Sequence, residues 1–247
     1  SRGLGDVYKR QIIDNPIISD ERKQEIYNTL SKNPYLLARD WYGKRVMPEG
    51  VIYSMFDMDE NICDQLQGIP IEMYFAGDGG QSDATSLSCN IVTKRRIEDE
   101  AGRDKYEYTL NRVANYYHSG AETGQVKAMS IYARELQQFI NWCVKKFNMR
   151  YTEILIDPAC KSLREEMHLL GMATRKADNN ARDVKGAAKG LEVGIERLQN
   201  LISNRVFQLV NVSEQYGHYN YIKELGMYCR GDTVSYTHLR AHETLMN

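Results

Sequence analysis

The stretch MYFAGDGGQSDATSLSCNI, residues 73–91, decides the fold that we expect for this chain. An apolar run leads to Asp78, two glycines allow a turn, and a second run of small and apolar residues follows. Two such runs on either side of a glycine turn are typical of neighbouring strands. The stretch therefore predicts a hairpin whose first strand, residues 71–78, ends on a carboxylate.

The pattern on both sides of this hairpin predicts an α/β fold with a mixed sheet. A helix capped by Ser19 is expected upstream, and a third strand follows the hairpin after a polar turn at residues 94–105. Helices expected at 128–147, 161–171, 185–203 and 211–228 then alternate with strands at 152–157, 172–177 and 205–210. Three strands joined by tight turns and then alternating helices and strands give antiparallel neighbours beside parallel ones, flanked by helices.

The composition of the chain excludes several classes of protein. None of its apolar runs approaches the roughly 20 residues that a bilayer requires, and the N-terminus does not resemble a secretory signal. We therefore expect no membrane partner and a cytoplasmic location. The net charge of −1 argues against a free-standing DNA-binding module. Five scattered cysteines without a CxxC pair favour reduced structural thiols over a zinc site or a disulfide framework.

The two ends of the chain fit none of the expected elements. Residues 1–11, SRGLGDVYKRQ, and residues 232–247, DTVSYTHLRAHETLMN, resemble translated adapter sequence. We expect both to be non-native and to contribute nothing to the fold.

Two aspartates stand at the ends of two expected strands. Asp78 closes the first strand of the sheet, and Asp157 closes the strand that follows the helix at 128–147. If these strands are parallel neighbours, both carboxylates emerge at the edge where open α/β sheets bind ligands. Two bare carboxylates about 4 Å apart repel by about 4 kcal/mol at an effective dielectric constant of 20, so the pair favours a bound cation. Oxygen ligands select Mg²⁺ or Mn²⁺, and two such ions can hydrolyse a phosphodiester.

The glycines that follow Asp78 suggest that a bulky polyanion approaches this turn closely. Asp83, beyond the turn, is a further candidate metal ligand, with a solvent-facing turn residue as the alternative. Glu224 is a late candidate carboxylate, with a helix-surface role as the alternative. Basic side chains that we expect either to contact DNA or to face water are Lys94, Arg95, Arg96, Arg175, Lys176, Arg182, Lys185 and Lys189.

An ordered set of motifs resembles the C-terminal half of the large terminase subunit of tailed phages and prophages. PEGVIYSMFD at 48–57 is similar to the segment that leaves the ATPase domain, and MYFAGDGGQSDATS at 73–86 is similar to the first nuclease strand. ILIDPACKSLREEMHLLG at 154–171 resembles the strand with the second carboxylate. Residues 176–210 and YIKELGMYCRGD at 221–232 resemble the segments that follow.

This resemblance implies an RNase H-like nuclease that cuts concatemeric double-stranded viral DNA in the host cytoplasm. It makes Asp78 and Asp157 catalytic metal ligands for two Mg²⁺ or Mn²⁺ ions, with the terminase small subunit and the portal protein as partners. It also divides the chain into a linker or end of the ATPase domain at 12–70 and a truncated nuclease domain at 71–231.

The family pattern has parts that this sequence lacks. Its third carboxylate lies in a later motif, which the chain does not reach before residue 232, and no GxxxxGK[ST] motif for ATP occurs. We therefore expect an incomplete active site and no ATP hydrolysis in this chain.

Two other functions remain open on the sequence. An actin-like or sugar-kinase-type ATP phosphotransferase also places a DGG turn against phosphates, although it needs a second glycine-rich loop. A catalytically inactive nuclease fold that serves as a docking module is the non-enzymatic alternative.

Overall fold

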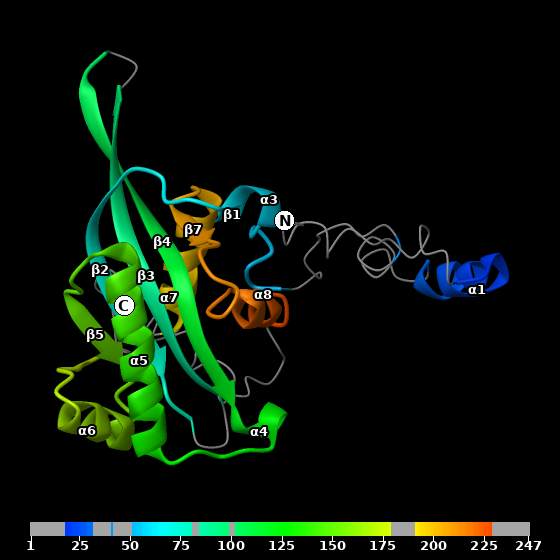
Figure 1. Ribbon diagram of the computed structural model, residues 1–247. Helices are drawn as coiled ribbons and strands as arrows, with labels where there is room; N and C mark the ends of the chain where they lie inside the picture. The colour runs from blue at the N-terminus through cyan, green and yellow to red at the C-terminus, as the bar shows by residue number, and fades with distance from the viewer. Residues whose placement is uncertain are drawn as a thin grey trace. The chain divides into compact units, whose positions relative to one another are not determined.

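The computed structural model describes residues 18–31, 41, 51–80, 84–98, 102–178 and 191–228 (Figure 1). The described residues fall into two units, of which the first runs to Met58 and resumes at Glu224, and the second comprises Asp59–Lys223. The segments 1–11 and 232–247 lie outside the described residues, so the expectation that they are non-native stays a prediction.

The first unit contains helix α1 (Asp20–Leu30), which begins where the sequence predicts. The hydroxyl of Ser19 accepts a hydrogen bond from a backbone N–H of the first turn, which confirms the expected cap. In the same unit the rings of Tyr53 and Tyr228 stack at 5.6 Å, and the N–H of Ile52 donates to the carbonyl of Tyr228 at 2.8 Å.

The second unit contains a seven-stranded sheet in the order β1-β7-β4-β3-β2-β5-β6. Its strands are β1 (Ile62–Cys63), β2 (Ile69–Asp78), β3 (Ala84–Glu98), β4 (Asp104–Ser119), β5 (Glu153–Ile156), β6 (Arg175–Lys176) and β7 (Phe207–Val210). The β2–β3 and β3–β4 pairs are antiparallel, and the other four pairs are parallel. The predicted mixed α/β sheet is confirmed.

Helices flank this sheet. They are α3 (Met58–Asn61), α4 (Gly120–Thr123), α5 (Met129–Phe147), α6 (Lys161–Leu169), α7 (Leu191–Ser203) and α8 (Tyr219–Leu225). In Figure 1 α5 crosses one face of the central strands, and α6 lies beside its end. The predicted apolar face of α5 is buried, and the ring of its Phe139 lies 6.0 Å from that of Phe75 on β2. This contact belongs to one hydrophobic core that fixes β2 and β5 beneath the helices.

Several elements differ in their bounds from the sequence-based expectation. β3 and β4 continue through residues 94–98 and 104–105, which we expected in a turn, because cross-strand ion pairs continue the ladder there. Helix α8 begins at Tyr219 rather than at 211, because the backbone before it bonds to strands: Asn211 donates to Cys63, and Tyr216 accepts from Asn115. The start expected for α7, residues 185–190, lies outside the described residues.

Strand β1 lies within the range that we expected to be a linker. Ile62 and Cys63 pair with Leu209 and Val210 of β7, so the sheet begins before residue 71. The remaining division of the chain into domains stays a prediction. In the described part of the chain, helices are all too short or too polar to cross a lipid bilayer.

Candidate metal centre

The predicted relationship between the two aspartate-bearing strands is confirmed. β2 and β5 are parallel neighbours, and Gly77 pairs with Ile156 at the ends of both. Asp78 is the next and last residue of β2, and Asp157 directly follows β5. The N–H of Asp157 donates to the carbonyl of Gly77 at 3.1 Å. The two carboxylates therefore leave the sheet at the same edge, where open α/β sheets hold ligands.

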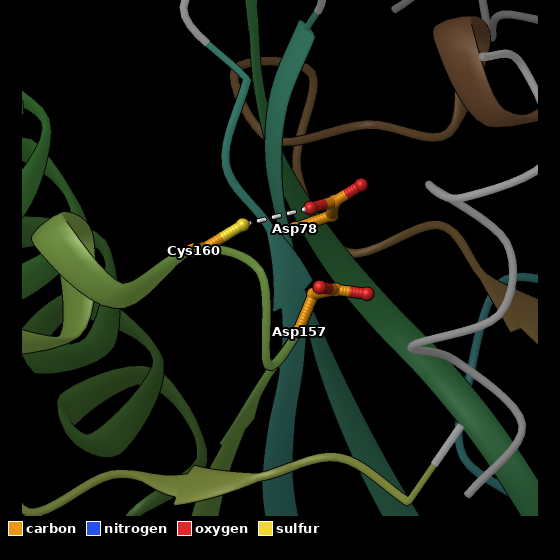
Figure 2. A group of neighbouring side chains, drawn as sticks. All are labelled: Asp78, Asp157 and Cys160. Atoms are coloured by element: carbon orange, nitrogen blue, oxygen red, sulfur yellow. Dashed lines mark hydrogen bonds between the residues drawn. The ribbon is translucent and has the colours of Figure 1, made fainter. Parts of the chain in front are cut away.

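Three side chains form a cluster at this edge. One ligand atom from each of Asp78, Asp157 and Cys160 lies within 4.8 Å of the others. Figure 2 shows both carboxylates projecting to the same side of the strand ends, with Cys160 reaching Asp78 from the side of α6. Asp157 is only 2% exposed, whereas Asp78 is partly exposed. The pair thus presents one buried and one accessible carboxylate to a common point.

The sequence DPAC, residues 157–160, builds the turn that holds Asp157. Its Oδ1 accepts the N–H of Ala159 at 2.6 Å, and its carbonyl accepts the N–H of Cys160 at 3.0 Å. Helix α6 begins directly after this turn. Asp157 is consequently fixed by the start of the helix as well as by the strand.

Cys160 connects this turn to the end of β2. Its sulfur lies 3.0 Å from Asp78 Oδ1 and 3.1 Å from the carbonyl of Gly79, and it accepts the N–H of Gly79 at 3.1 Å. Burial, reinforced by the negative charge of Asp78, raises the pKa of the Cys160 thiol to about 12. The side chain is therefore a neutral thiol at physiological pH and donates to the carboxylate.

The donor set fits a hard divalent cation better than a soft one. Mg²⁺ and Mn²⁺ take carboxylate and water oxygens, whereas zinc sites use thiolates and imidazoles. Asp78 and Asp157 provide the oxygens, and the sulfur of Cys160 lies beside them as a hydrogen-bond partner of Asp78. These two aspartates are the described residues that would hold such an ion.

Gly79 has a packing role that the sequence does not reveal, and the approach of a polyanion to this turn stays a prediction. A side chain there would meet the Leu163 side chain of α6 at 2.7 Å and the Cys160 sulfur at 3.7 Å. The missing side chain at Gly79 thus lets α6 pack against the strand end.

The other predicted acidic and basic residues are not members of this cluster or lie outside the described residues. Asp83, Arg182, Lys185 and Lys189 lie outside them. Glu224 is on α8, in the residues assigned to the first unit, and it is absent from the cluster that the described residues form. The roles expected for all of these residues stay predictions.

Two described basic patches lie at different places on the sheet. Lys176 on β6 pairs with Ile156, the residue before Asp157, while neighbouring Arg175 forms an ion pair with Glu153. Lys94, Arg95 and Arg96 lie toward the far end, because Lys94 pairs with Ile69 at the start of β2. There Arg95 and Arg96 are paired with Glu107 and Asp104, and the Lys94 amine lies 5.4 Å from the centre of the Tyr106 ring.

Sequence reasoning missed Cys160. We expected the cysteines to be structural thiols, and only the position of Cys160, three residues after a candidate metal ligand, could have signalled a role at the site. Its contact with Asp78 spans 82 positions of sequence. The pattern within either segment does not reveal that contact.

Comparison with known proteins identifies this fold. Protein-family models and curated proteins give no match to the chain. Among solved structures, the large terminase of the thermophilic bacteriophage D6E is similar with a TM-score of 0.57 and 18% identity, over 96% of this chain and 54% of that one. The nuclease domain of the P22 large terminase is similar with a TM-score of 0.50 and 14% identity, over 81% of this chain and 93% of that domain. The chain spans about half the length of the D6E protein and has the RNase H-like fold of a terminase nuclease domain.

Proposed function

We propose that this chain is the metal-dependent endonuclease part of a viral DNA-packaging terminase large subunit. The observation that carries the proposal is the pair of carboxylates, Asp78 and Asp157, at the ends of two parallel strands in a sheet of this fold. Its substrate is concatemeric double-stranded DNA. The small subunit and the portal protein are the proposed protein partners, and the host cytoplasm is the proposed location.

The chemistry would take place at the edge of the sheet where the two carboxylates project. Asp157, buried and bonded to its own turn, provides a fixed ligand, and Asp78 provides an accessible one. When bound, Mg²⁺ or Mn²⁺ acidifies a water molecule and stabilises the charge that develops on a phosphodiester. The resemblance implies a third carboxylate for a two-ion site, and the described residues bring the carboxylates of Asp78 and Asp157 together, so we expect an incomplete two-ion site.

Of the two alternatives, the docking module is the one that the experiment below is designed to test. The phosphotransferase requires a second glycine-rich loop, and residues 157–163 at the end of β5 contain no glycine. A docking module keeps the fold but has no need of a cation between Asp78 and Asp157.

Calorimetric titration of the full chain with Mn²⁺ tests the proposal. We expect the wild type to bind, and Asp78→Asn and Asp157→Asn each to weaken binding by at least tenfold. Asp104→Asn is the control, because that exposed carboxylate lies in the β3–β4 hairpin and pairs with Arg96. Binding that is absent, or that survives in both site variants, contradicts the nuclease and favours the docking module. Plasmid cleavage that requires Asp78 would contradict the expectation that the active site of this chain is incomplete.

A further inference from the structure

The cluster at the ends of β2 and β5 includes a group that the metal chemistry itself does not use. Cys160 is 8% exposed, and its side chain makes polar contacts in addition to its apolar packing. It contacts the Asp78 carboxylate and both backbone polar groups of Gly79. Its own N–H bonds to Asp157. One residue at the start of α6 thus touches both chain segments that carry the proposed ligands.

We infer that Cys160 is the positioning residue of the metal centre, whose thiol orients the Asp78 carboxylate toward Asp157. The inference rests on the proposed function, because it concerns how that site holds its cation. The hydrogen bond to Oδ1 restricts rotation of the Asp78 side chain, which is partly exposed and lies next to a glycine turn. With Oδ1 held on the α6 side, the other oxygen is presented on the side that Asp157 also faces (Figure 2).

The contacts of the sulfur explain why a thiol suits this position. The N–H of Gly79 donates to the sulfur, and the single S–H proton has two acceptors within reach, Asp78 Oδ1 and the Gly79 carbonyl. A hydrogen-bond donor at this position is needed to hold the carboxylate, since an apolar side chain cannot donate a hydrogen bond to it. Residues that bond to metal ligands typically change metal affinity by 10–100-fold when they are removed.

Two substitutions separate this role from simple packing. We expect Cys160→Ala to weaken Mn²⁺ binding by about tenfold in calorimetry on the full chain, and Cys160→Ser, which keeps a donor, to stay within about threefold of the wild type. Cys143→Ala is the matched control, because Cys143 is equally a buried free thiol but lies in α5 away from the carboxylates. It should lower thermal stability and leave Mn²⁺ affinity unchanged.

A measurement on the unaltered protein tests the same inference if the alanine variant does not fold. We expect saturating Mn²⁺ to change the rate of Cys160 alkylation several-fold, as followed by peptide mass spectrometry, because the bound cation acts on the carboxylate that bonds to the thiol. Cys63, a more accessible thiol on β1, is the internal reference and should react at the same rate with and without Mn²⁺.

The outcomes also separate this inference from the proposed function. Unchanged Mn²⁺ affinity in Cys160→Ala, failure of serine to restore binding, or an unchanged alkylation rate would overturn the positioning role while Asp78-dependent binding still supports the nuclease. Loss of binding in the wild type itself would overturn both.

Discussion

The backbone N–H of Asp157 donates to the carbonyl of Gly77 at 3.1 Å, and this bond joins the residue that follows β5 to the next-to-last residue of β2. Asp78 follows Gly77 directly, so the bond fixes the spacing of the backbone from which the two carboxylates project. An arrangement of this kind keeps the proposed site in place even without a cation. It also makes the site sensitive to small changes in the backbone at Gly77.

Gly77→Ala should therefore impair both stability and metal binding. The added methyl group would lie 2.5 Å from the Ser86 carbonyl oxygen and 2.6 Å from a Leu87 methyl carbon, so β2 must shift. We expect a loss of about 1–3 kcal/mol in the free energy of unfolding, measured with urea, together with weaker Mn²⁺ binding. Gly102→Ala, in the hairpin with open space around it, should lose stability through its positive φ and leave Mn²⁺ affinity unchanged. Equal Mn²⁺ affinities in the wild type and Gly77→Ala would contradict the link between this backbone and the site.

Asp157→Asn should stabilise the protein without metal. The carboxylates of Asp78 and Asp157 lie within 4.8 Å, where two unit charges repel by about 3 kcal/mol at an effective dielectric constant of 20. Because Asp78 is partly exposed, we expect a gain of about 1 kcal/mol in urea unfolding with EDTA. Asparagine can still accept the N–H of Ala159, so the turn is preserved.

The same variant should lose the stabilisation that Mn²⁺ gives the wild type, since a ligand stabilises only the state that binds it. The order of stability would then reverse between EDTA and saturating Mn²⁺. If Asp157→Asn were less stable than the wild type in EDTA, the two carboxylates would not be in repulsion, and a cation would not be needed between them.

The two aspartates could be predicted from the sequence because each ends an apolar strand, which is a local pattern. The prediction that they meet then depended only on β2 and β5 being neighbours in the sheet, as they are. Strand β1 could not be predicted, since its two residues are too few to show an alternating pattern and become a strand only beside β7. Pairing across a sheet is a property of distant segments.

The start of α8 was predicted wrongly, and the contact of Cys160 was not predicted, for the same reason. Residues 211–218 have polar and aromatic content compatible with a helix, yet bonds such as Asn211 to Cys63 commit that backbone to other segments. Tertiary hydrogen bonds override a weak local preference. The thiol at 160 likewise gains its partner only when α6 meets the end of β2.

The two basic patches should differ in their contribution to DNA binding. Lys176 lies beside Ile156 at the edge that carries Asp157, whereas Lys94 faces Ile69 at the other end of β2, roughly 30 Å from Asp78 at the usual rise per residue. That separation is several Debye lengths at physiological salt. We expect Lys176→Ala to lower DNA affinity and to reduce the salt-dependence slope by about one unit.

The double variant Arg95→Ala with Arg96→Ala is the comparison for this prediction. Both side chains are exposed and paired with carboxylates, so stability should change by less than about 1 kcal/mol. Its DNA affinity, measured by fluorescence anisotropy over a salt series, should fall less than that of Lys176→Ala. A larger loss in the double variant would place the DNA along the hairpin instead.

His218 should make the protein sensitive to mild acid. Its Nε2–H donates to the Val210 carbonyl, and its Nδ1 accepts from the Asn115 amide at 2.7 Å. Burial, reinforced by the positive charge of Arg112, lowers the pKa of this imidazole to about 4, although the bond to Val210 opposes the shift. The folded protein thus holds His218 neutral, whereas the unfolded chain takes up a proton near pH 6.5.

Because protonation favours the unfolded chain, the contribution of neutral His218 is complete above pH 6.5 and is lost as the pH falls toward 4. The shift corresponds to about 3 kcal/mol over that window. His218→Gln should lower stability at pH 7 but flatten the loss between pH 7 and pH 4.5 in urea unfolding. His168→Gln is the control, since His168 is exposed and bonds to Thr174. Equal slopes for the wild type and His218→Gln would show that His218 takes up its proton over the same pH range in the folded and the unfolded protein.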